Sequence, residues 1–326
     1  MKNVLVTGGT GFVGSNLSEH LLHLGCDVRI LRRENSDLRA INGVDVEHCI
    51  GNVGDINSLR NAMRGCDTVF HTAAMVTFSR RRKDEQHDVN VIGTRNVVEA
   101  CIKCGVDTLV HTSSVAAIGY PEPGQLATEE TAFNWGEASG YKRSKLLAER
   151  EVLAGVRRGL RAVMVNPSPI VGERDLHLHG GQLVRDMKKG RVLFYIDGGM
   201  SIVYVGDVVT GHIHAAERGR TGERYILCGE NLTHREIFLR TAKLVGGRPP
   251  IAKLPIPLLR LGARAIESTA GILGREPWLS SDLVAGAGRF NWFSCEKARR
   301  ELDYKITSFD TAILAAYRWY KENDFL

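Results

Sequence analysis

The stretch that decides the fold is Val4–Gly14, VLVTGGTGFVG, where an apolar run meets a glycine-rich turn. A helical repeat of apolar residues begins in the turn and continues to Gly25, a plausible C-terminal cap. Glycines at positions 8, 11 and 14 let the backbone turn tightly and approach a phosphate, and a helix N-terminus adds free N–H groups. The spacing differs from the commoner G-x-G-x-x-G, and a plain strand-to-helix turn is the alternative. Strand, turn and helix in this order predict a dinucleotide cradle.

Length and composition describe an ordinary globular chain. It has 326 residues, 43% hydrophobic and 25% charged, enough for a nucleotide-binding domain and a smaller lobe. No apolar run reaches membrane-spanning length, and Met1–Asn3 leads into an expected core strand without a signal peptide. We therefore expect a cytoplasmic protein with no membrane span. The net charge of +6 comes without a nucleic-acid motif, so an anionic cofactor is the expected partner and nucleic acid is not.

The seven cysteines are dispersed and odd in number, which does not suggest a disulfide framework. Cys101 and Cys104 form a C-x-x-C pair, but it falls in an expected helix over 96–104 and has no second Cys or His pair nearby in sequence. We expect small buried thiols there. His177 and His179 have the spacing of a metal pair without a supporting carboxylate or thiol, so no metal site is predicted.

Strand and helix patterns alternate through the first half of the chain, as in a parallel sheet with helices on both faces. The expected strands are 4–7, 28–31, 46–50, 68–72, 108–112 and 162–166, and the expected helices are 11–24, 56–64, 89–104 and 141–153. The predicted fold is α/β, a Rossmann-type doubly wound parallel sheet with a smaller C-terminal substrate-binding lobe. In such sheets ligands bind beyond the carboxyl ends of the strands.

The pattern changes beyond Pro167, where glycine and proline become more frequent and four prolines between 249 and 257 punctuate the chain. We expect residues 1–166, joined by about 203–230, to form the dinucleotide-binding domain. The remainder of 167–326 then forms the substrate-binding lobe. An amphipathic pattern over 258–273 predicts a helix that either lines a substrate pocket or caps the core.

Tyr141 and Lys145 form the second strong signal, because residues four apart share one face of a helix. A lysine ammonium near a phenol favours the phenolate and lowers its pKa, which suits the phenol to proton transfer. A solvated surface pair is the alternative. Ser113 and Ser114 end the strand at 108–112, where a hydroxyl can hydrogen-bond a carbonyl oxygen beside the tyrosine. We assign the catalytic role to Ser114 and a structural role to Ser113.

Together these residues resemble the extended short-chain dehydrogenase/reductase family, also described as the epimerase/dehydratase superfamily. The matching segments are the turn at 7–14, Asn90 within 88–94, Ser113 and Ser114, Tyr141 and Lys145, 166–168 and 297–304. Within the family the chain resembles the dihydroflavonol 4-reductase-like branch, which includes bacterial proteins labelled hopanoid-associated sugar epimerases. Residues 141–151 and 222–233 carry that likeness.

The resemblance implies a role for each matching position. Tyr141 would protonate the substrate oxygen, Ser114 would hold that oxygen, and Lys145 would bind the nicotinamide ribose and tune the phenol. The positions implied to contact the cofactor are Gly8, Thr10, Gly11, Phe12, Val13, Arg32, Arg33, Asn52, Val53, Thr72, Ala73, Ala74, Thr112, Tyr141, Lys145, Pro167 and Ser168. Asn52 departs from the aspartate common among relatives, from which we expect weaker adenine binding, not its loss.

Cofactor preference follows from the end of the second expected strand. Enzymes that prefer NAD carry an acid there, whereas this chain has Arg32 followed by Arg33. A guanidinium attracts a 2′-phosphate and can bond it bidentately, so we predict NADP(H) in preference to NAD. Two surface arginines that end a strand by chance are the alternative.

The leading hypothesis is an NADP(H)-dependent oxidoreductase that reduces a ketone or aldehyde to an alcohol, with a flavonoid-like or steroid-like substrate. The second is a nucleotide-sugar epimerase using bound NAD(P), which Arg32 and the lack of a recognisable diphosphate clamp disfavour. A non-enzymatic NADP sensor is disfavoured because such relatives usually lose the Tyr–Lys pair. The basic run Arg80–Lys83 either borders the substrate or, as we favour, forms a solvated loop. The resemblance also implies a homodimer interface near 89–104 and 141–155, although monomers occur in the branch.

Overall fold

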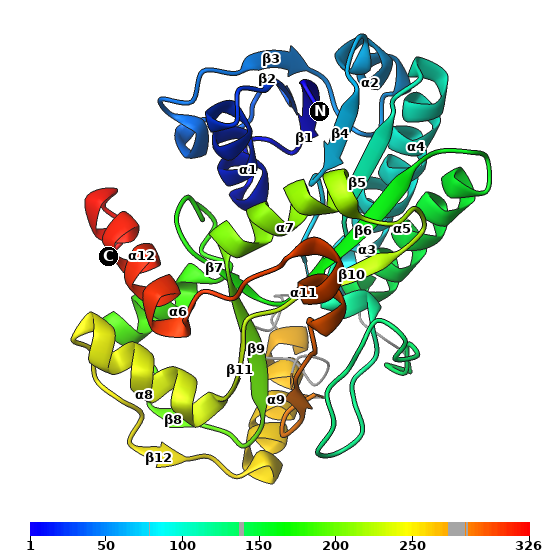
Figure 1. Ribbon diagram of the computed structural model, residues 1–326. Coiled ribbons are helices and arrows are strands. Elements are labelled where there is room, and N and C mark those ends of the chain that lie inside the picture. The colour runs from blue at the N-terminus through cyan, green and yellow to red at the C-terminus, as the bar shows by residue number, and fades with distance from the viewer. Residues whose placement is uncertain (78, 137–139, 273–283, 285) are drawn as a thin grey trace.

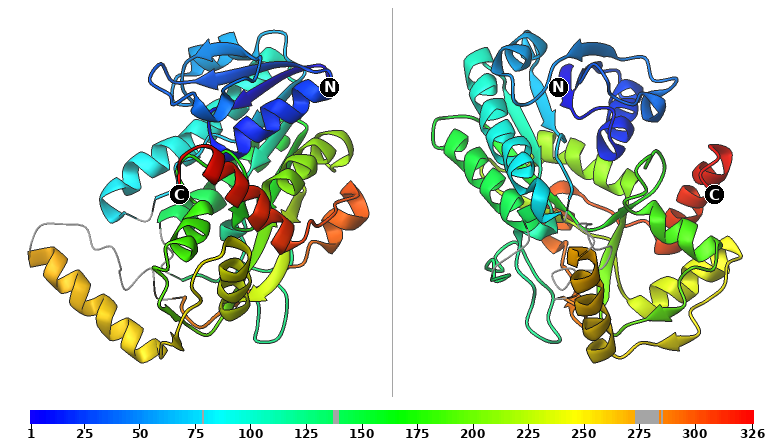
Figure 2. Two further views of the ribbon diagram at one scale, coloured as in Figure 1. Left: turned by 90° about the vertical axis from the view of Figure 1, so that its left-hand side faces the viewer. Right: turned by 180° about the vertical axis from the view of Figure 1, so that it is seen from behind.

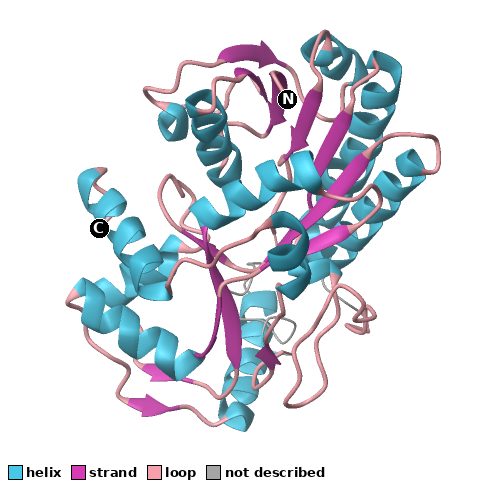
Figure 3. Ribbon diagram, viewed as in Figure 1, coloured by secondary structure: helices cyan, strands magenta, loops and turns pink. Residues whose placement is uncertain are grey.

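A parallel sheet forms the centre of the molecule (Figures 1 and 3). The computed structural model describes residues 1–326 except 78, 137–139, 273–283 and 285. In this described part the main sheet has seven strands in the order β10-β6-β5-β4-β1-β2-β3, and every pairing is parallel. The strands are β1 Asn3–Thr7, β2 Asp27–Arg32, β3 Glu47–Ile50, β4 Thr68–His71, β5 Thr108–Thr112, β6 Ala162–Pro167 and β10 Arg224–Leu227.

The strand order reverses between β1 and β4, which is the position where doubly wound sheets bind ligands. This confirms the predicted α/β fold, and each of the six expected strands lies within two residues of its prediction. The seventh strand, β10, comes from the second half of the chain and pairs with β6. The chain therefore leaves the sheet after β6 and returns to it.

Alternate strand residues pack against helices on opposite faces. Val4 and Val6 of β1 lie in a core with α1 (Phe12–His23) and α7 (Val205–Arg218), whereas Leu5 lies in a core with the helices of the other face. Those helices are α2 (Ile56–Met63), α4 (Gly93–Cys104) and α5 (Gly140–Val156), which cover the face seen from behind in Figure 2. Both faces of the sheet are thus buried, as a parallel sheet requires.

A second core belongs to the smaller lobe, at the lower left of Figure 1. Its sheet joins β7 (Ile170–Val171), β9 (Gly199–Tyr204), β11 (Glu230–Thr233) and β13 (Phe290–Asn291). The helices α6 (Gly181–Lys188), α8 (His234–Val245) and α12 (Phe309–Glu322) pack on it through side chains such as Ile313 and Tyr320. The remaining elements are β8 Phe194–Tyr195, β12 Ala252–Lys253, α3 Lys83–His87, α9 Ile256–Ile272, α11 Glu296–Leu302 and the short turns η1 Arg39–Ile41, η2 Arg80–Arg82 and η4 Val115–Ala117.

Two expected helices differ in detail from the structure. The helix expected over 89–104 begins as a π-helix, η3 (Asp88–Ile92), before α4. The helix expected over 258–273 is α9, and its expected last residue, Leu273, lies outside the described residues. Among the described residues, no helix combines the length and apolarity needed to cross a membrane.

Candidate active site

The glycine turn sits at the carboxyl end of β1, against the end of β4. Gly8 has a φ of +72°, which favours glycine, and its carbonyl accepts a hydrogen bond of 2.9 Å from the N–H of Gly11. A Cβ at Gly14 would lie 2.2 Å from that carbonyl oxygen, and one at Gly8 would lie 2.7 Å from the nitrogen of Ala73. Helix α1 starts at Gly11 with no side-chain cap and no acid in its first turn. Its free N–H groups therefore favour an anion.

Tyr141 and Ser114 meet although they lie on separate elements. Ser114 precedes η4 in extended backbone, and its hydroxyl accepts a 3.1 Å hydrogen bond from the N–H of Ala116. The same hydroxyl hydrogen-bonds the Tyr141 phenol from the first turn of α5. Burial raises the pKa of Tyr141, and the bond to Ser114 opposes that shift. The lowering by Lys145 that we expected from the sequence is not found, so the phenol holds its proton at neutral pH.

Lys145 lies one helical turn beyond Tyr141, and its ammonium is 2.9 Å from the Thr112 carbonyl oxygen at the end of β5. Only 3% of the residue is exposed. Burial lowers its pKa to about 8, and the Glu149 carboxylate opposes that shift. The predicted triad of Ser114, Tyr141 and Lys145 is therefore assembled at one strand end.

Glu149 is a buried carboxylate that the sequence analysis missed. One oxygen accepts hydrogen bonds from the Ser113 hydroxyl at 2.5 Å and the Asn166 amide at 2.6 Å, and the other lies 3.4 Å from the Arg224 guanidinium. The Asn166 amide also donates to the Ser114 carbonyl, at 3.0 Å. The carboxylate therefore ties α5 to β5, β6 and β10. Its spacing of four from Lys145 was the available signal.

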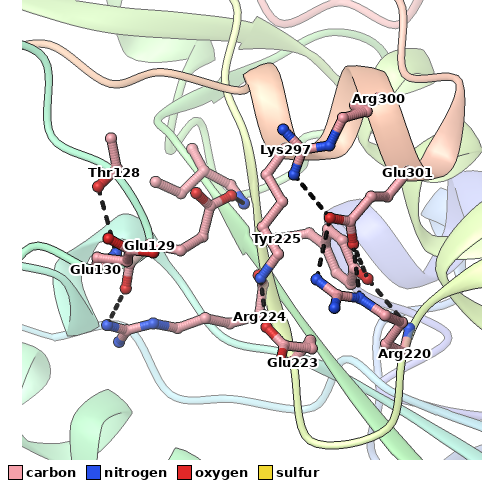
Figure 4. Close-up of polar contacts among 11 residues, drawn as sticks. Thr128, Glu129, Glu130, Arg220, Glu223, Arg224, Tyr225, Lys297, Arg300 and Glu301 are labelled. Carbon is pink, nitrogen blue, oxygen red and sulfur yellow. Dashed lines mark hydrogen bonds and ion pairs between the residues drawn. The ribbon is translucent and has the colours of Figure 1, made fainter.

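Ion pairs hold the edge strand β10 that supplies Arg224 (Figure 4). The Arg224 guanidinium also donates to the Glu129 carbonyl, and the Lys297 ammonium bridges the Glu223 carboxylate, at 2.5 Å, and the Arg224 carbonyl, at 2.9 Å. Glu301 of α11 accepts hydrogen bonds from the side chains of Arg220, Tyr225 and Arg300. These contacts hold the Arg224 guanidinium beside the Glu149 carboxylate.

The π-helix η3 explains how α5 keeps its place. Its Asn90 side chain accepts from the Met75 N–H at 2.7 Å and donates to the Met75 carbonyl at 3.0 Å. The same amide donates to the Ser144 hydroxyl at 2.9 Å, and Ser144 donates to the Tyr141 carbonyl at 2.8 Å. An extra residue in the helical turn aims Asn90 at both neighbours, as π-bulges at functional sites do.

Two buried histidines lie close to Lys145, at the same register of β4 and β5. His71 contacts the hydroxyls of Thr7 and Thr94, at 2.8 and 3.0 Å, and its ring centroid is 5.2 Å from that of His111. Burial and the charge of Lys145 lower the pKa of His71 to about 3, and burial likewise lowers that of His111. Both rings are therefore neutral. No sequence pattern predicts that the two rings meet, because their contact depends on the register between β4 and β5.

The residues expected at the adenosine end adopt different roles. Arg32 donates from Nε to His48 at 2.9 Å and from Nη1 to the backbone carbonyls of the turn that follows β2. Arg33 is exposed, and its side chain has no hydrogen-bond partner among the described residues. The Asn52 side-chain oxygen accepts from the Gly54 N–H at 2.8 Å, and Val53 is buried beneath. The arginine that remains available for a phosphate is thus Arg33.

The residues of the site fit a dinucleotide, because polar groups that could bind one have no partner among the described residues. Ser168 follows Pro167 at the end of β6, is 2% exposed, and has a hydroxyl with no partner among the described residues. Thr72, by contrast, donates to the Thr7 carbonyl at 2.7 Å and shapes the wall beside the glycine turn. An unpaired hydroxyl, free helix N–H groups and a turn with no room for side chains are what a phosphate-bearing cofactor requires.

Of the other candidates, the cysteine pair lies on α4, and the basic run reaches the start of α5, where Lys83 packs against Gly140. Cys101 is buried beside Met63, Cys104 contacts the Arg60 carbonyl, and all seven cysteines are free thiols. In the basic run 80–83, Arg82 pairs with Glu85 at 2.9 Å. In the described part of the chain, no three His, Cys, Asp or Glu residues gather closely enough to hold a metal.

A protein-family model described as "NAD dependent epimerase/dehydratase family" matches residues 4–228 of this chain. The chain belongs to this family. It is 33% identical to a putative dihydroflavonol 4-reductase of Synechocystis, over 98% of this chain and 95% of that protein. It is 32% identical to sterol demethylase protein B of Methylococcus capsulatus, over 99% of each. It is 30% identical to bovine sterol-4-alpha-carboxylate 3-dehydrogenase, decarboxylating, over 96% of this chain and 90% of that protein.

Solved structures agree with the fold. The crystal structure of gox2253 shares 35% identity and a TM-score of 0.89, and each chain is covered completely. The UDP-glucose 4-epimerase of Thermus thermophilus, solved with NAD, has a TM-score of 0.77 at 24% identity, over 98% and 99% of the two chains. The second likeness shows the fold alone. Family membership makes the chain an NAD(P)-dependent oxidoreductase or an epimerase/dehydratase.

Proposed function

We propose that this protein is an NADP(H)-dependent oxidoreductase that interconverts a carbonyl and an alcohol, and that reduction of a ketone or aldehyde is the chemistry its site suits. The observation that carries the proposal is the bond between the Ser114 hydroxyl and the buried Tyr141 phenol, one helical turn from the Lys145 ammonium. A proton donor, an oxygen-binding hydroxyl and a cation thus meet at the carboxyl end of β5. This strand pairs with β4, which in turn pairs with β1, the strand that leads into the glycine turn.

The cofactor supplies the hydride when bound. The glycine turn and α1 would hold its pyrophosphate, Arg33 would hold its 2′-phosphate, and Ser168 would contact a polar group at the nicotinamide end. We assign residues 1–166 and about 203–230 to the cofactor and the rest of 167–326 mainly to the substrate. Tyr141 donates its proton to the carbonyl oxygen, and Ser114 donates a hydrogen bond to that oxygen. Lys145, held on the Thr112 carbonyl one helical turn beyond Tyr141, would bind the nicotinamide ribose of the cofactor.

The Tyr141 phenol carries its proton at neutral pH, because burial raises its pKa, and so has a proton to donate in reduction. The relatives named for dihydroflavonol reduction and sterol dehydrogenation support an extended apolar substrate. Sterol alcohol oxidation is the same chemistry in reverse.

The test is oxidation of NADPH and of NADH by the purified protein, with ketones, flavanonols, steroid ketones and aldehydes. Turnover with NADPH preferred supports the proposal. Tyr141→Phe is expected to abolish turnover while NADPH still binds. Absence of turnover, with NAD retained through purification and conversion of a nucleotide sugar, would instead identify an epimerase.

A further inference from the structure

A cluster of cations and aromatic rings includes Lys142, the residue that follows the proposed proton donor in sequence. Lys142 follows Tyr141 on α5, and its ammonium lies 3.1 Å from the ring centroid of Trp135. The Arg289 guanidinium carbon lies 4.0 Å from the ring centroid of Tyr120 and 5.9 Å from that of Trp135. The two rings meet edge to face at 5.1 Å. We call these four residues the cation–aromatic cluster.

In the part of the chain that the structure describes, no carboxylate pairs with the two cations of the cluster. Across the described ranges, neither Lys142 nor Arg289 forms an ion pair, although Arg224 and Arg240 each contact a carboxylate. Burial, together with the charge of Arg289, lowers the pKa of Lys142 to about 8. Lys142 also occupies the first turn of α5, where the helix dipole disfavours a cation. Lys142 is half-buried and Arg289 is exposed, so an incoming anion can reach both and would offset the repulsion between the two charges.

The rings that hold the cations are themselves fixed. The Trp135 indole N–H donates to the Ile118 carbonyl at 2.7 Å. The Asn134 side chain accepts from the Tyr120 N–H at 2.9 Å and donates to the Tyr120 carbonyl at 3.0 Å. The Lys142 ammonium and the Arg289 guanidinium contact the faces of these rings. Such contacts leave N–H groups of the two cations available to donate hydrogen bonds. The cluster is therefore arranged before any ligand arrives.

Resting on the proposed function, we propose that Lys142 and Arg289 bind an anionic group of the carbonyl substrate, a carboxylate or a phosphate. The cofactor's phosphates have their own partners at the ends of β1 and β2, whereas α5 follows β5 on the other side of the β1–β4 switch point. A guanidinium bonds either oxyanion bidentately, and a lysine adds a point charge. The two residues would set specificity without taking part in proton transfer.

The test compares matched substrates. A ketone that the enzyme reduces is prepared as its carboxylic acid, its phosphate ester analogue and its neutral methyl ester, and kcat and KM are measured for each. We expect a charged form to be preferred through KM by about 10- to 100-fold, the range for a charge-assisted hydrogen bond. Which of the two charged forms is preferred identifies the anion. The preference is expected to weaken with added salt.

Variants decide whether the two cations cause that preference. Lys142→Met and Arg289→Met are each expected to lower the acid-to-ester preference in kcat/KM at least tenfold, because each removes one cation and keeps a long side chain. Arg143→Met removes the exposed neighbouring charge on α5 and is expected to change nothing. The proposal is overturned if wild type treats acid and ester alike, if either variant slows both equally, or if the variants weaken NADPH binding instead.

A binding measurement separates this proposal from the proposed function. Trp135 is a reporter at the cluster, so the carboxylate ketone is titrated while tryptophan fluorescence is followed, with Trp135→Phe as the blank. Saturable quenching that Lys142→Met and Arg289→Met abolish supports the anion site even if no ketone is turned over. Turnover without any such quenching or acid preference supports the reductase and overturns the anion site.

Discussion

At the scale of single residues, burial of the Lys145 ammonium lowers the stability of the folded protein at neutral pH. Its pKa is lowered from 10.5 to about 8 in the folded protein. Below pH 8 the ammonium is charged in both states and folding bears the cost of burying it, on the order of 3 kcal/mol. Between pH 8 and 10.5 the folded state loses the proton first, so the wild type gains stability as pH rises.

Lys145→Met is therefore expected to abolish turnover, and its stability relative to wild type is expected to fall as pH rises. The free energy of unfolding, from urea titrations at pH 7 to 10.5, should show the variant's advantage shrinking by on the order of 3 kcal/mol. Loss of the bond to the Thr112 carbonyl shifts the whole curve and not its slope, because that loss is the same at every pH. A difference independent of pH would contradict the buried ammonium.

The arginines after β2 make a second prediction. Arg33→Ala is expected to raise KM for NADPH about tenfold and leave KM for NADH nearly unchanged, because it removes one charge-assisted contact to the 2′-phosphate. Arg32→Ala is expected to raise both, because Arg32 braces the turn through His48 and two backbone carbonyls. Steady-state kinetics with both cofactors check this, and a selective NADPH defect in Arg32→Ala alone would reverse the assignment.

At the scale of elements, Glu149 couples α5 to the strand ends through charge as well as hydrogen bonds. Its carboxylate raises the pKa of Lys145 against the effect of burial. Glu149→Gln keeps the shape but removes that charge, so the pKa of Lys145 falls and the alkaline limb of the kcat profile is expected to move to lower pH. We expect a stability loss of about 1–3 kcal/mol as well, because the amide nitrogen that replaces one carboxylate oxygen leaves the Arg224 guanidinium without its acceptor.

Glu151→Gln on the same helix is the matched control. Glu151 pairs with Arg95 at the surface, at 2.9 Å, and its change is expected to alter stability by less than about 1 kcal/mol and to leave the pH profile in place. If Glu149→Gln lowered stability without moving the alkaline limb, its role would be structural alone.

The elements also show what the sequence can predict. Strands β1 to β6 follow from apolar runs bounded by turn residues, and the glycine turn from its place after β1, because these signals are local. Glu149, His71 and the cation–aromatic cluster were missed because their meaning depends on contacts between residues far apart, such as Arg224 with Glu149. The π-helix η3 was missed because the bond of Asn90 to Met75 that accompanies it joins residues from different segments of the fold.

At the scale of the molecule, the two lobes share a core. Phe293, Leu302 and Tyr304, near the C-terminus, pack in the same cluster as Val165 and Tyr225 of the main sheet. The smaller lobe's own core, which contains Ile313 and Tyr320, is separate. The cofactor site lies on the sheet that the first of these cores supports, so ligand binding there should stabilise both lobes against unfolding.

We therefore expect one cooperative thermal transition that NADP+ moves upward. At a concentration of 100 times Kd, one bound ligand adds about 2.7 kcal/mol, which corresponds to several degrees in Tm. NAD+ at the same concentration is expected to give a smaller shift because it lacks the phosphate that Arg33 binds, and Arg33→Ala should remove the difference between them. Scanning calorimetry with each nucleotide measures this without any substrate. A second transition unaffected by NADP+ would mean that the smaller lobe unfolds independently, and equal shifts with both nucleotides would remove the basis for NADP(H) preference.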